Sequence, residues 1–354
     1  MARHTIMKAA LLLAGLVPAA ARADNPTPYV ASPVEGLAVL GSDLVWKAGC
    51  GSGFTSTRSH IRTVSATAWP AGGDLPGGGL LGRGLYEPRG CGRDAVESRN
   101  VVADDLYVYF IDRGRHLMRI ARSGGAPQLM AYVEPAAGAG YVLALSNRWI
   151  AWSNGAAVFR MRTDGVPRFT PVHAIFEPGG TALVGSLLPL GDGYVVRAGN
   201  RLHRLAPPPG GARVFLSTPI HGTENVMAFT VYGDEIVVAV PGSDGNYAVR
   251  ALRPDGQVTY HLPAVVRPGD RVDHIAVAQG QLYWHIAAGH GGAGPIMRMA
   301  LPGLLGDRVP VRITPDLRMT DSRFAFSAGY LFWTNPADRR LYRLSVGTPG
   351  LGPR

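Results

Sequence analysis

A unit of two apolar strands joined by a polar turn recurs along the whole chain. It is clearest at residues 329–347, GYLFWTNPADRRLYRLSVG, where aromatic and aliphatic runs flank a turn of Asn, Pro, Asp and Arg. Seven such units occur, and their leading strands have a first core residue at Leu44, Leu106, Ile150, Val195, Ile236, Leu282 and Leu331. After a first interval of 62 residues these positions are 41 to 49 residues apart, which is room for about four short strands in each unit.

A second strand follows each leading strand and places an apolar, aromatic or histidine residue beside an arginine. The seven pairs are Ile61-Arg62, Met118-Arg119, Phe159-Arg160, His203-Arg204, Val249-Arg250, Met297-Arg298 and Tyr342-Arg343. A short apolar run precedes each leading strand, and a more polar run follows several of the arginine strands, as at 127–133 and 257–263. Four strands repeated seven times predict an all-β fold, a seven-bladed β-propeller.

The two ends of such a ring must meet, because an open ring would leave strand edges unpaired. The last unit is followed only by TPGLGPR, which is too rich in Gly and Pro for an outer strand. Residues 27–32, TPYVAS, have the composition of the missing strand. We therefore expect the N-terminal strand to pair onto the last blade and close the ring.

The first 23 residues have the features of a secretory signal peptide. Basic Arg3 and Lys8 precede an apolar run over 9–17, and Ala21-Arg22-Ala23 is a small-residue cleavage site before Asp24. No other stretch approaches the roughly 20 apolar residues of a membrane helix. The sequence predicts cleavage near Ala23 and a single propeller domain over 24–354, secreted or periplasmic, with no transmembrane segment.

The chain is basic, with a formal net charge of +10, of which +7 is left once Arg3, Lys8 and Arg22 are removed with the leader. Its arginines are spread along the chain, many at one repeat position. A nucleic-acid-binding surface would concentrate them on one face, so the pattern does not favour a nucleic-acid partner.

Two cysteines, Cys50 and Cys91, lie in a chain expected to reach an oxidising compartment. We predict a disulfide bond between them, since no local Cys/His arrangement points to a catalytic thiol. Closing this loop would stabilise the fold by about 4 kcal/mol in the chain-entropy model.

The repeated QLYWHI and YLFWTN strands, taken with the arginine strands, resemble the repeats of YWTD, NHL and TolB-like propellers. The resemblance covers nearly all of 24–354 and is one of repeat pattern. It departs from YWTD blades because Asn335 stands where the Asp after Trp-Thr would be. Propellers include binding proteins, scaffolds and enzymes, so the resemblance implies the fold and no activity.

Propellers usually place a ligand at the mouth of the central channel, in residues just before each inner strand and in loops between second and third strands. The polar residues at these positions are Glu35, Arg99, Asn100, Glu224, Asn225, Asp273, His274, Asp321 and Arg323. Glu224, His274 and Asp321 come from successive blades, and oxygen ligands with one imidazole suit Ca²⁺, Mg²⁺ or Mn²⁺. A general acid/base pair and a purely structural polar rim are the alternatives.

Other polar or aromatic patterns are expected to be structural. The Gly-rich stretch that begins at His285 and contains His290 matches no zinc signature, and we expect both histidines to lie in a solvated loop. The repeated arginines should cover blades and bond carbonyls or acids of the next blade. Four tryptophans at one strand position should form core between blades, namely Trp46, Trp152, Trp284 and Trp333.

No motif for nucleophilic catalysis is present, since there is no G-x-S-x-G and no HExxH. The sequence therefore favours a monomeric, exported, non-enzymatic binding scaffold whose ligand is a protein, peptide or carbohydrate at the channel face. The alternative is a metal-assisted lyase or lactonase that uses Glu224, His274 and Asp321, with His274 moving the proton.

Overall fold

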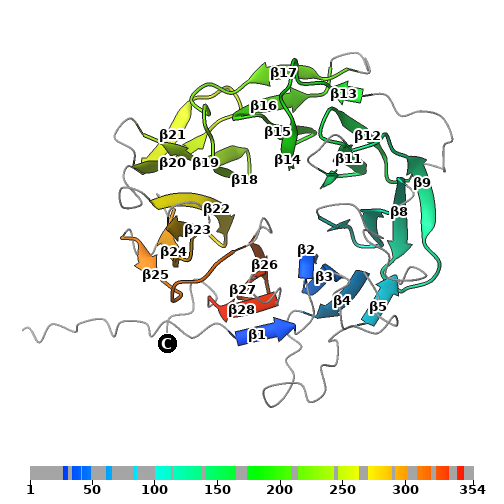
Figure 1. Cartoon of the computed structure of the whole chain (residues 1–354), viewed down its shortest axis with the longest axis horizontal. Coiled ribbons are helices and arrows are strands. Elements are labelled where there is room, and N and C mark those ends of the chain that lie inside the picture. The colour runs from blue at the N-terminus through cyan, green and yellow to red at the C-terminus, as the bar shows by residue number, and fades with distance from the viewer. Residues whose placement is uncertain are drawn as a thin grey trace, which may run out of the picture.

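Seven four-stranded antiparallel sheets form a ring in the computed structural model (Figure 1). The structure describes residues 27–30, 34–40, 42–48, 61–65, 83–86, 100–112, 115–136, 140–164, 174–208, 214–242, 246–262, 270–288, 292–301, 309–319, 324–334 and 341–346. Every element within these ranges is a strand, turn or loop, so the predicted all-β propeller of seven blades is confirmed.

Each blade runs from an inner to an outer strand in chain order, apart from the last. Blade 1 is β2 (Val34–Leu40), β3 (Asp43–Ala48), β4 (Ile61–Ser65) and β5 (Arg83–Tyr86); blade 2 is β6 (Val102–Ala103), β7 (Tyr107–Ile111), β8 (His116–Ala121) and β9 (Gln128–Tyr132). Blade 3 is β10 (Val142–Ser146), β11 (Trp149–Ser153), β12 (Val158–Arg162) and β13 (Ala174–Phe176); blade 4 is β14 (Val184–Leu190), β15 (Gly193–Ala198), β16 (Arg201–Ala206) and β17 (Leu216–Pro219). Blade 5 is β18 (Ala228–Tyr232), β19 (Glu235–Pro241), β20 (Tyr247–Leu252) and β21 (Val258–Leu262); blade 6 is β22 (Asp270–Ala278), β23 (Gln281–Ala288), β24 (Ile296–Ala300) and β25 (Val311–Arg312). Blade 7 is β26 (Ala325–Ser327), β27 (Tyr330–Thr334), β28 (Leu341–Ser345) and β1 (Thr27–Val30).

The ring is closed as predicted, because β1 forms the outer strand of blade 7 (Figure 1). It pairs antiparallel with β28, with Thr27 opposite Arg343 and Pro28 opposite Tyr342. Two segments far apart in the sequence thus complete one sheet and remove the edge that an open ring would have.

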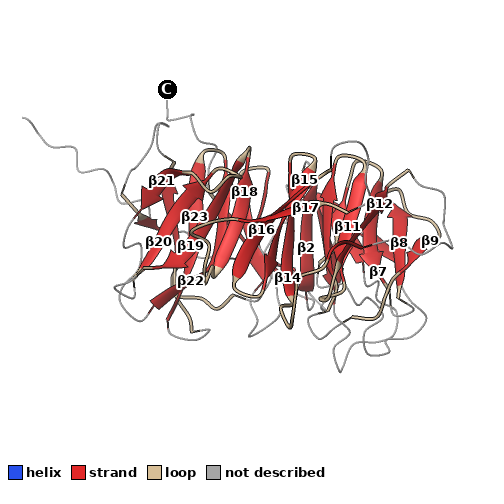
Figure 2. Ribbon diagram, turned by 90° about the horizontal axis from the view of Figure 1, so that it is seen from above, coloured by secondary structure: helices blue, strands red, loops and turns tan. Residues whose placement is uncertain are grey.

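The strands cross the ring from one face to the other (Figure 2). The inner strands begin on one face of the ring, which we call the channel-mouth face. The loops that join second to third strands lie on this face too. Short turns from inner to second strands lie on the opposite face, for example Asn147-Arg148 between β10 and β11. A residue's place along its strand therefore decides which face it can serve.

Seven clusters of buried apolar side chains hold the ring together, each shared by two neighbouring blades. The second strands are buried on both sides, so they read as unbroken apolar runs, whereas outer strand β17 is exposed throughout. The predicted tryptophans belong to these clusters and are at most 1% exposed. The indole N–H groups of Trp46, Trp152 and Trp284 find no acceptor in the described part of the chain, as fits a packing role.

Six of the seven predicted first core residues are fully buried, but Leu106 is 69% exposed and that prediction is wrong. Strand β7 begins one residue later, and Val108 is the buried residue, opposite Ala103 of β6. Asp104 accounts for the shift, because its carboxylate accepts hydrogen bonds from the backbone N–H groups of Leu106 and Tyr107 and holds this segment as a turn.

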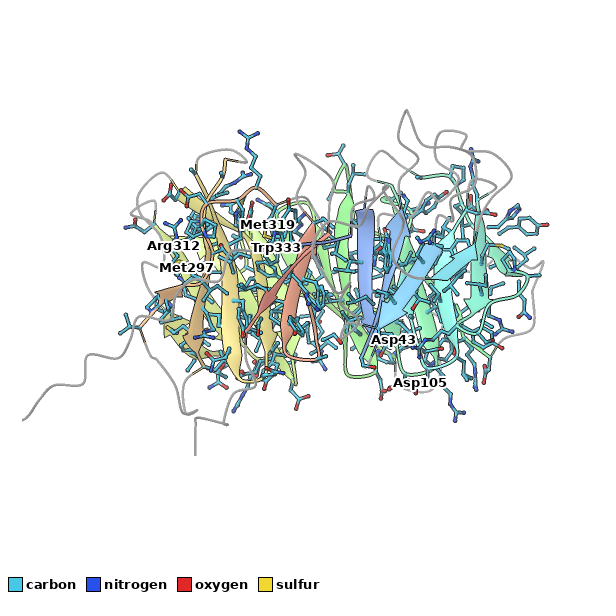
Figure 3. All side chains as sticks on the ribbon, turned by 90° about the horizontal axis from the view of Figure 1, so that it is seen from below. Asp43, Asp105, Met297, Arg312, Met319 and Trp333 are labelled. Carbon is cyan, nitrogen blue, oxygen red and sulfur yellow. The ribbon has the colours of Figure 1, made fainter. Side chains whose placement is uncertain are left out.

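Two of the repeated arginines join neighbouring blades, as predicted. Arg119 of blade 2 donates to the carbonyl of Thr163 in blade 3 at 2.6 Å, and Arg298 of blade 6 donates to the carbonyl of Val346 in blade 7 at 3.4 Å. Charges also pair across blades on the opposite face, where Arg122 of blade 2 forms an ion pair with Asp43 of blade 1, near Asp105 (Figure 3).

No helix in the described ranges is long and apolar enough to cross a membrane. Cys50, Cys91 and the leader lie outside the described residues, so the disulfide bond, the cleavage near Ala23 and the destination of the chain stay predictions.

Candidate functional site

Asn100, one of the predicted channel-mouth residues, serves the contact between blades 2 and 3. Its side-chain amide donates to the carbonyl of Leu143 at 2.7 Å and accepts from the Leu143 N–H at 2.9 Å. The amide thus substitutes for a backbone pairing partner beside β10, and both of its polar atoms are occupied by the fold.

Glu224 and Asn225 lie in the loop before β18 and are tied to the hairpin of blade 4. Glu224 forms an ion pair with Arg201 at 3.2 Å, and Asn225 accepts from Asn200 at 2.8 Å. Asn225 has a φ of 59°, a left-handed conformation that asparagine tolerates. Both residues are exposed on the channel-mouth face.

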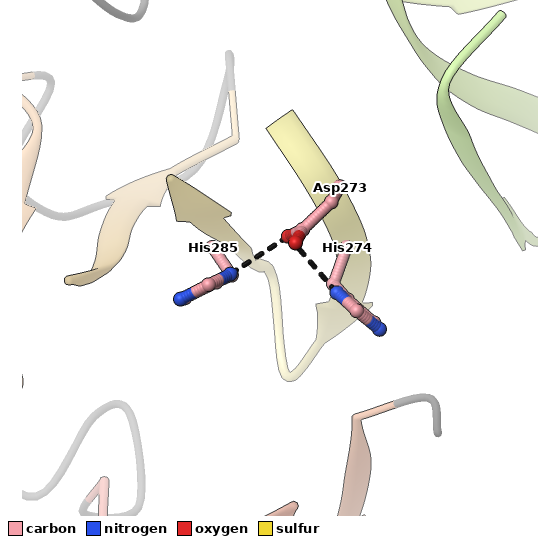
Figure 4. Close-up of side chains that lie close together, drawn as sticks. All are labelled: Asp273, His274 and His285. Atoms are coloured by element: carbon pink, nitrogen blue, oxygen red, sulfur yellow. Dashed lines mark hydrogen bonds and ion pairs between the residues drawn. The ribbon is translucent and has the colours of Figure 1, made fainter. Parts of the chain in front are cut away.

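Asp321 and Arg323 lie outside the described residues, and of Glu35 only the backbone in β2 is described. The proposed metal set Glu224, His274 and Asp321 therefore stays a prediction. The described residues instead bring together Asp273, His274 and His285 at the channel-mouth end of blade 6 (Figure 4).

A β-bulge in the inner strand builds this cluster. The register of β22 against β23 shifts between Val272 and His274, so Asp273 is an extra residue and His274 lies directly opposite His285. Neighbouring side chains in a regular strand point to opposite faces, but here Asp273 and His274 reach each other. The bulge thus places one carboxylate between two imidazoles.

The same bulge occurs at the start of the inner strands of blades 1 and 4. Register shifts between Val34 and Gly36 and between Val184 and Ser186, in the sequences VEG and VGS, which correspond to VDH in blade 6. In each case the residue after the bulge lies opposite a basic residue of the second strand. Gly36 pairs with Lys47, Ser186 with Arg197 and His274 with His285. Blade 6 is distinguished by having imidazoles on both strands.

His285 makes three hydrogen bonds and is fully buried. Its Nδ1 lies 2.7 Å from Oδ1 of Asp273, and its Nε2 lies 2.9 Å from the carbonyl of Leu317 and 3.1 Å from that of Gly294. Carboxylate and carbonyl oxygens only accept, so all three contacts are hydrogen bonds only when both ring nitrogens carry hydrogen, as in the imidazolium cation. The geometry is that of a buried ion pair with Asp273.

Asp273 accepts through the same oxygen from His274, whose Nδ1 is 2.9 Å away. Burial opposes ionisation of this carboxyl, but the hydrogen bonds from His274 and His285, with their charges, outweigh it and hold the pKa of Asp273 well below its ordinary value of 3.8. The carboxylate is therefore ionised at all physiological pH values.

His274 is the member of the cluster that can act outward. Its side chain is 11% exposed, its ring lies 6.0 Å from the ring of Phe324, and its Nε2 makes no hydrogen bond to any residue that the structure describes. With Nδ1–H donating to Asp273, Nε2 carries the lone pair in the neutral ring. Such a nitrogen can accept a hydrogen bond, take up a proton or bind a metal ion.

In the arrangement that the structure shows, Asp273, His274 and His285 do not form a metal centre with three protein ligands. Both nitrogens of His285 are directed at acceptors, and Oδ1 of Asp273 already accepts two hydrogen bonds. Among the described contacts, Nε2 of His274 and Oδ2 of Asp273 are available without breaking these hydrogen bonds, which is two ligand atoms and not three.

His285 was missed by the sequence analysis, and its assignment to a solvated loop is wrong, because it lies inside β23 and is fully buried. The sequence contains a signal for this contact. If DHIAVA and LYWHIA pair as a hairpin with a two-residue turn at Gln279-Gly280, His274 lies opposite His285, and the bulge then brings Asp273 beside them.

No protein-family model matches the sequence, and neither does any curated protein sequence. Solved structures do match over most of the chain. YCF48 bound to D1 peptide has a TM-score of 0.58 at 11% identity, covering 91% of this chain and 94% of that one. A chain of the mitotic checkpoint complex has a TM-score of 0.56 at 11% identity, covering 97% and 99%.

Enzymes also share the fold. A prolyl endopeptidase gives a TM-score of 0.60 at 15% identity, and the match covers 90% of this chain but only 48% of the endopeptidase. At these identities the similarity shows the fold alone.

Proposed function

We propose that this protein is exported and acts as a monomeric binding scaffold, without catalytic activity of its own, for a protein, peptide or carbohydrate at the channel-mouth face of the propeller. Export follows from the predicted leader over 1–23, with cleavage near Ala23. The repeats resemble those of YWTD, NHL and TolB-like propellers, a resemblance that fits a binding role as well as any other.

The observation that carries the proposal is the way in which the Asp273 cluster satisfies itself. The carboxylate of Asp273 and His285 neutralise each other, and His285 is anchored to two backbone carbonyls, so the pair holds the geometry and is not free to react. His274 is fixed by the same carboxylate, with Nε2 left for an outside partner. One oriented hydrogen-bonding group beside the ring of Phe324 suits recognition of a polar group on a ligand.

Binding of a peptide is supported by analogy of shape, since YCF48 is a propeller-like match whose structure holds a D1 peptide. The channel-mouth face of this chain exposes Glu224 and Asn225 before β18 and places His274 on the next blade. A peptide lying across the mouth would contact loops from several blades at once.

The test is selection against a random dodecapeptide phage library and a glycan array with the mature protein, repeated with His274→Ala and with Arg312→Gln. Arg312 is an exposed residue paired with Asp316, so its variant is a control for a surface change. A peptide or glycan that binds wild type and Arg312→Gln but not His274→Ala supports the proposal. If every binder is indifferent to His274, the channel-mouth site is ruled out.

A metal-assisted lyase or lactonase is the second candidate, and the orientation of His274 by Asp273 is the observation that favours it. A bound Ca²⁺, Mg²⁺ or Mn²⁺ would supply polarisation of an ester or lactone carbonyl. Metal analysis of the mature protein and a panel of lactones would test this reading, with Glu224→Ala, His274→Ala and Asp321→Ala. Turnover that is lost in all three variants would replace the scaffold proposal with an enzyme.

A further inference from the structure

A pocket of about 750 Å³ lies between blades 3 and 4 on the face opposite the channel mouth. It is lined by Ser146, Asn147, Arg148, Trp149, Arg160, Arg162, Asp192 and Pro207. These residues come from the inner turns of both blades, from β12 and from the end of β16. The pocket is therefore separate from the Asp273 cluster, which is in blade 6 and opens on the other face.

Arg160 is held between two aromatic rings beside this pocket. Its guanidinium carbon lies 4.0 Å from the centre of the Trp149 ring and 4.1 Å from that of Phe215, which precedes β17 of blade 4. The two rings cover the faces of the planar guanidinium, so its N–H groups can donate only from its edges. None of its N–H groups bonds to an acceptor in the part of the chain that the structure describes.

The same repeat position is satisfied differently elsewhere. Arg119 and Arg298 each donate to a carbonyl that follows the third strand of the next blade, at Thr163 and Val346. The corresponding place after β16 is Pro207, which lines the pocket without accepting from Arg160. Blades 2 and 3 and blades 6 and 7 close this contact, whereas blades 3 and 4 leave a cavity.

The charges around the pocket favour an anion. Arg162 donates twice to Asp164, at 2.8 and 2.6 Å, so these two charges are paired. Asp192 of the lining accepts from the uncharged amide of Asn147 at 3.2 Å and keeps its charge, so two arginines, Arg148 and Arg160, stand against one carboxylate. The backbone carbonyl of Arg148 accepts a hydrogen bond from Thr163 N–H, but its guanidinium makes none to a described residue. Arg148 and Arg160 are thus two cationic groups of the lining that lack a bonded acid in the described chain.

Tyr194, which packs in the core between blades 3 and 4 and is not in the pocket lining, has a second donor without a described partner. It is 1% exposed, its hydroxyl is buried with no hydrogen-bond partner among the described residues, and its pKa is raised to about 12 by burial, which the charge of Arg160 partly opposes. A buried hydroxyl without a partner costs free energy unless something completes it.

We infer that this pocket is a binding site for a small oxyanion, a carboxylate or phosphate group, which Arg160 receives edge-on while Trp149 and Phe215 fix the guanidinium. Charge-assisted hydrogen bonds to a planar guanidinium are shorter and stronger than neutral ones, and an arginine already held by rings loses little freedom on binding. Arg148 supplies a second positive charge at the rim. The carboxylate could belong to an acidic metabolite or to a peptide, and phosphate to an inorganic or organic source.

The experiment is isothermal titration calorimetry of the mature protein at low ionic strength with inorganic phosphate and, separately, with succinate. Arg160→Gln should weaken binding of the preferred anion by about tenfold or more, and Arg148→Gln by about threefold. Arg312→Gln, which removes the same charge from blade 6, should bind as wild type does. Arg160→Lys keeps the charge without the planar fork and should bind more weakly than wild type.

Tighter binding of phosphate than of succinate, or the reverse, assigns the chemical class of the anion, and either result supports the site if it depends on Arg160. If Arg160→Gln does not fold, the comparison of Arg148→Gln with Arg312→Gln decides the matter, because both residues are exposed. No binding of either anion, or equal loss in Arg148→Gln and Arg312→Gln, would overturn the inference.

Discussion

Buried His285 pairs with half-buried Asp273, with Nδ1 of the imidazole 2.7 Å from Oδ1 of the carboxylate, and the other imidazole nitrogen bonded to the carbonyl of Leu317. Leu317 lies beyond the last strand of blade 6, and its backbone pairs with that of Gly294. A single buried histidine therefore links the inner strand of the blade to the loop and chain segment on its outer side. The stability of the channel mouth at this blade should depend on the pair.

Replacing Asp273 with Asn should lower the free energy of unfolding by about 3 kcal/mol, because it leaves a buried imidazolium without its counter-charge. The measurement is urea unfolding at pH 6. Asp316→Asn removes an exposed carboxylate from the same blade and should cost less than about 1 kcal/mol. Equal costs in the two variants would show that the Asp273 pair is energetically neutral.

The pH dependence of stability should report the same carboxyl. Its folded pKa is below the ordinary 3.8, so its stabilising contribution is complete above the unfolded pKa and is lost as the pH falls toward the folded value. The stability difference between wild type and Asp273→Asn should be at its full value at about pH 5 to 6 and should shrink steadily below about pH 4. Thermal melting of both proteins between pH 3 and 6 measures this, and a difference that grows toward low pH would contradict it.

The two histidines should separate stability from recognition. His285→Gln should cost about 2 kcal/mol or more, since one amide cannot serve three buried acceptors. His274→Gln should change stability by less than about 1 kcal/mol while abolishing binding of any ligand selected at the channel mouth. Unfolding and binding assays on the two variants test this, and the opposite order of stabilities would reverse the roles assigned here.

Closure of the ring should be needed for a stable monomer. A mature chain that begins after Val30 lacks β1 and exposes the edge of β28, so it should melt at least about 5 °C lower and associate through that edge. Size-exclusion chromatography with light scattering and a melting curve measure both effects. A chain that begins at Thr27 is the control and should behave as the full mature protein does.

The predicted disulfide bond between Cys50 and Cys91 can be checked directly. The non-reduced mature protein should have no free thiol, and the double variant Cys50→Ser/Cys91→Ser should lose up to about 4 kcal/mol of stability in the chain-entropy model. Thiol titration and unfolding with and without reductant give the answer. Two reactive thiols in protein taken from the periplasm would contradict the prediction.

The parts of the fold that repeat could be predicted, and the parts that differ between repeats could not. The apolar positions of Leu282 and Trp284 have counterparts on the other second strands, because these strands are buried on both sides. That burial leaves a repeated apolar pattern in the sequence. Leu106 was misplaced because the carboxylate of Asp104 forms a local turn, which an apolar pattern does not record.

The candidate site was predicted in part for a similar reason. Asp273 and His274 were found because they precede an inner strand, whereas His285 is visible only through cross-strand register, which depends on a one-residue bulge. Glu224 was expected to face His274, but its nearest charge is Arg201 on the hairpin of the preceding blade. Long side chains near a loop choose partners by geometry that spacing along the chain does not fix.

The pairing of Thr27 with Arg343 also sets the order in which the protein can be completed. Strand β1 is made before β28 and has no place in the ring until β28 has formed, so β1 waits unpaired while the blades between them assemble. A chain interrupted before β28 would keep that free strand and could not finish blade 7. A chain that contains β28 can cover β1, whereas a chain interrupted before β28 leaves β1 exposed. Proteases that cleave exposed strands would therefore degrade the interrupted chains first.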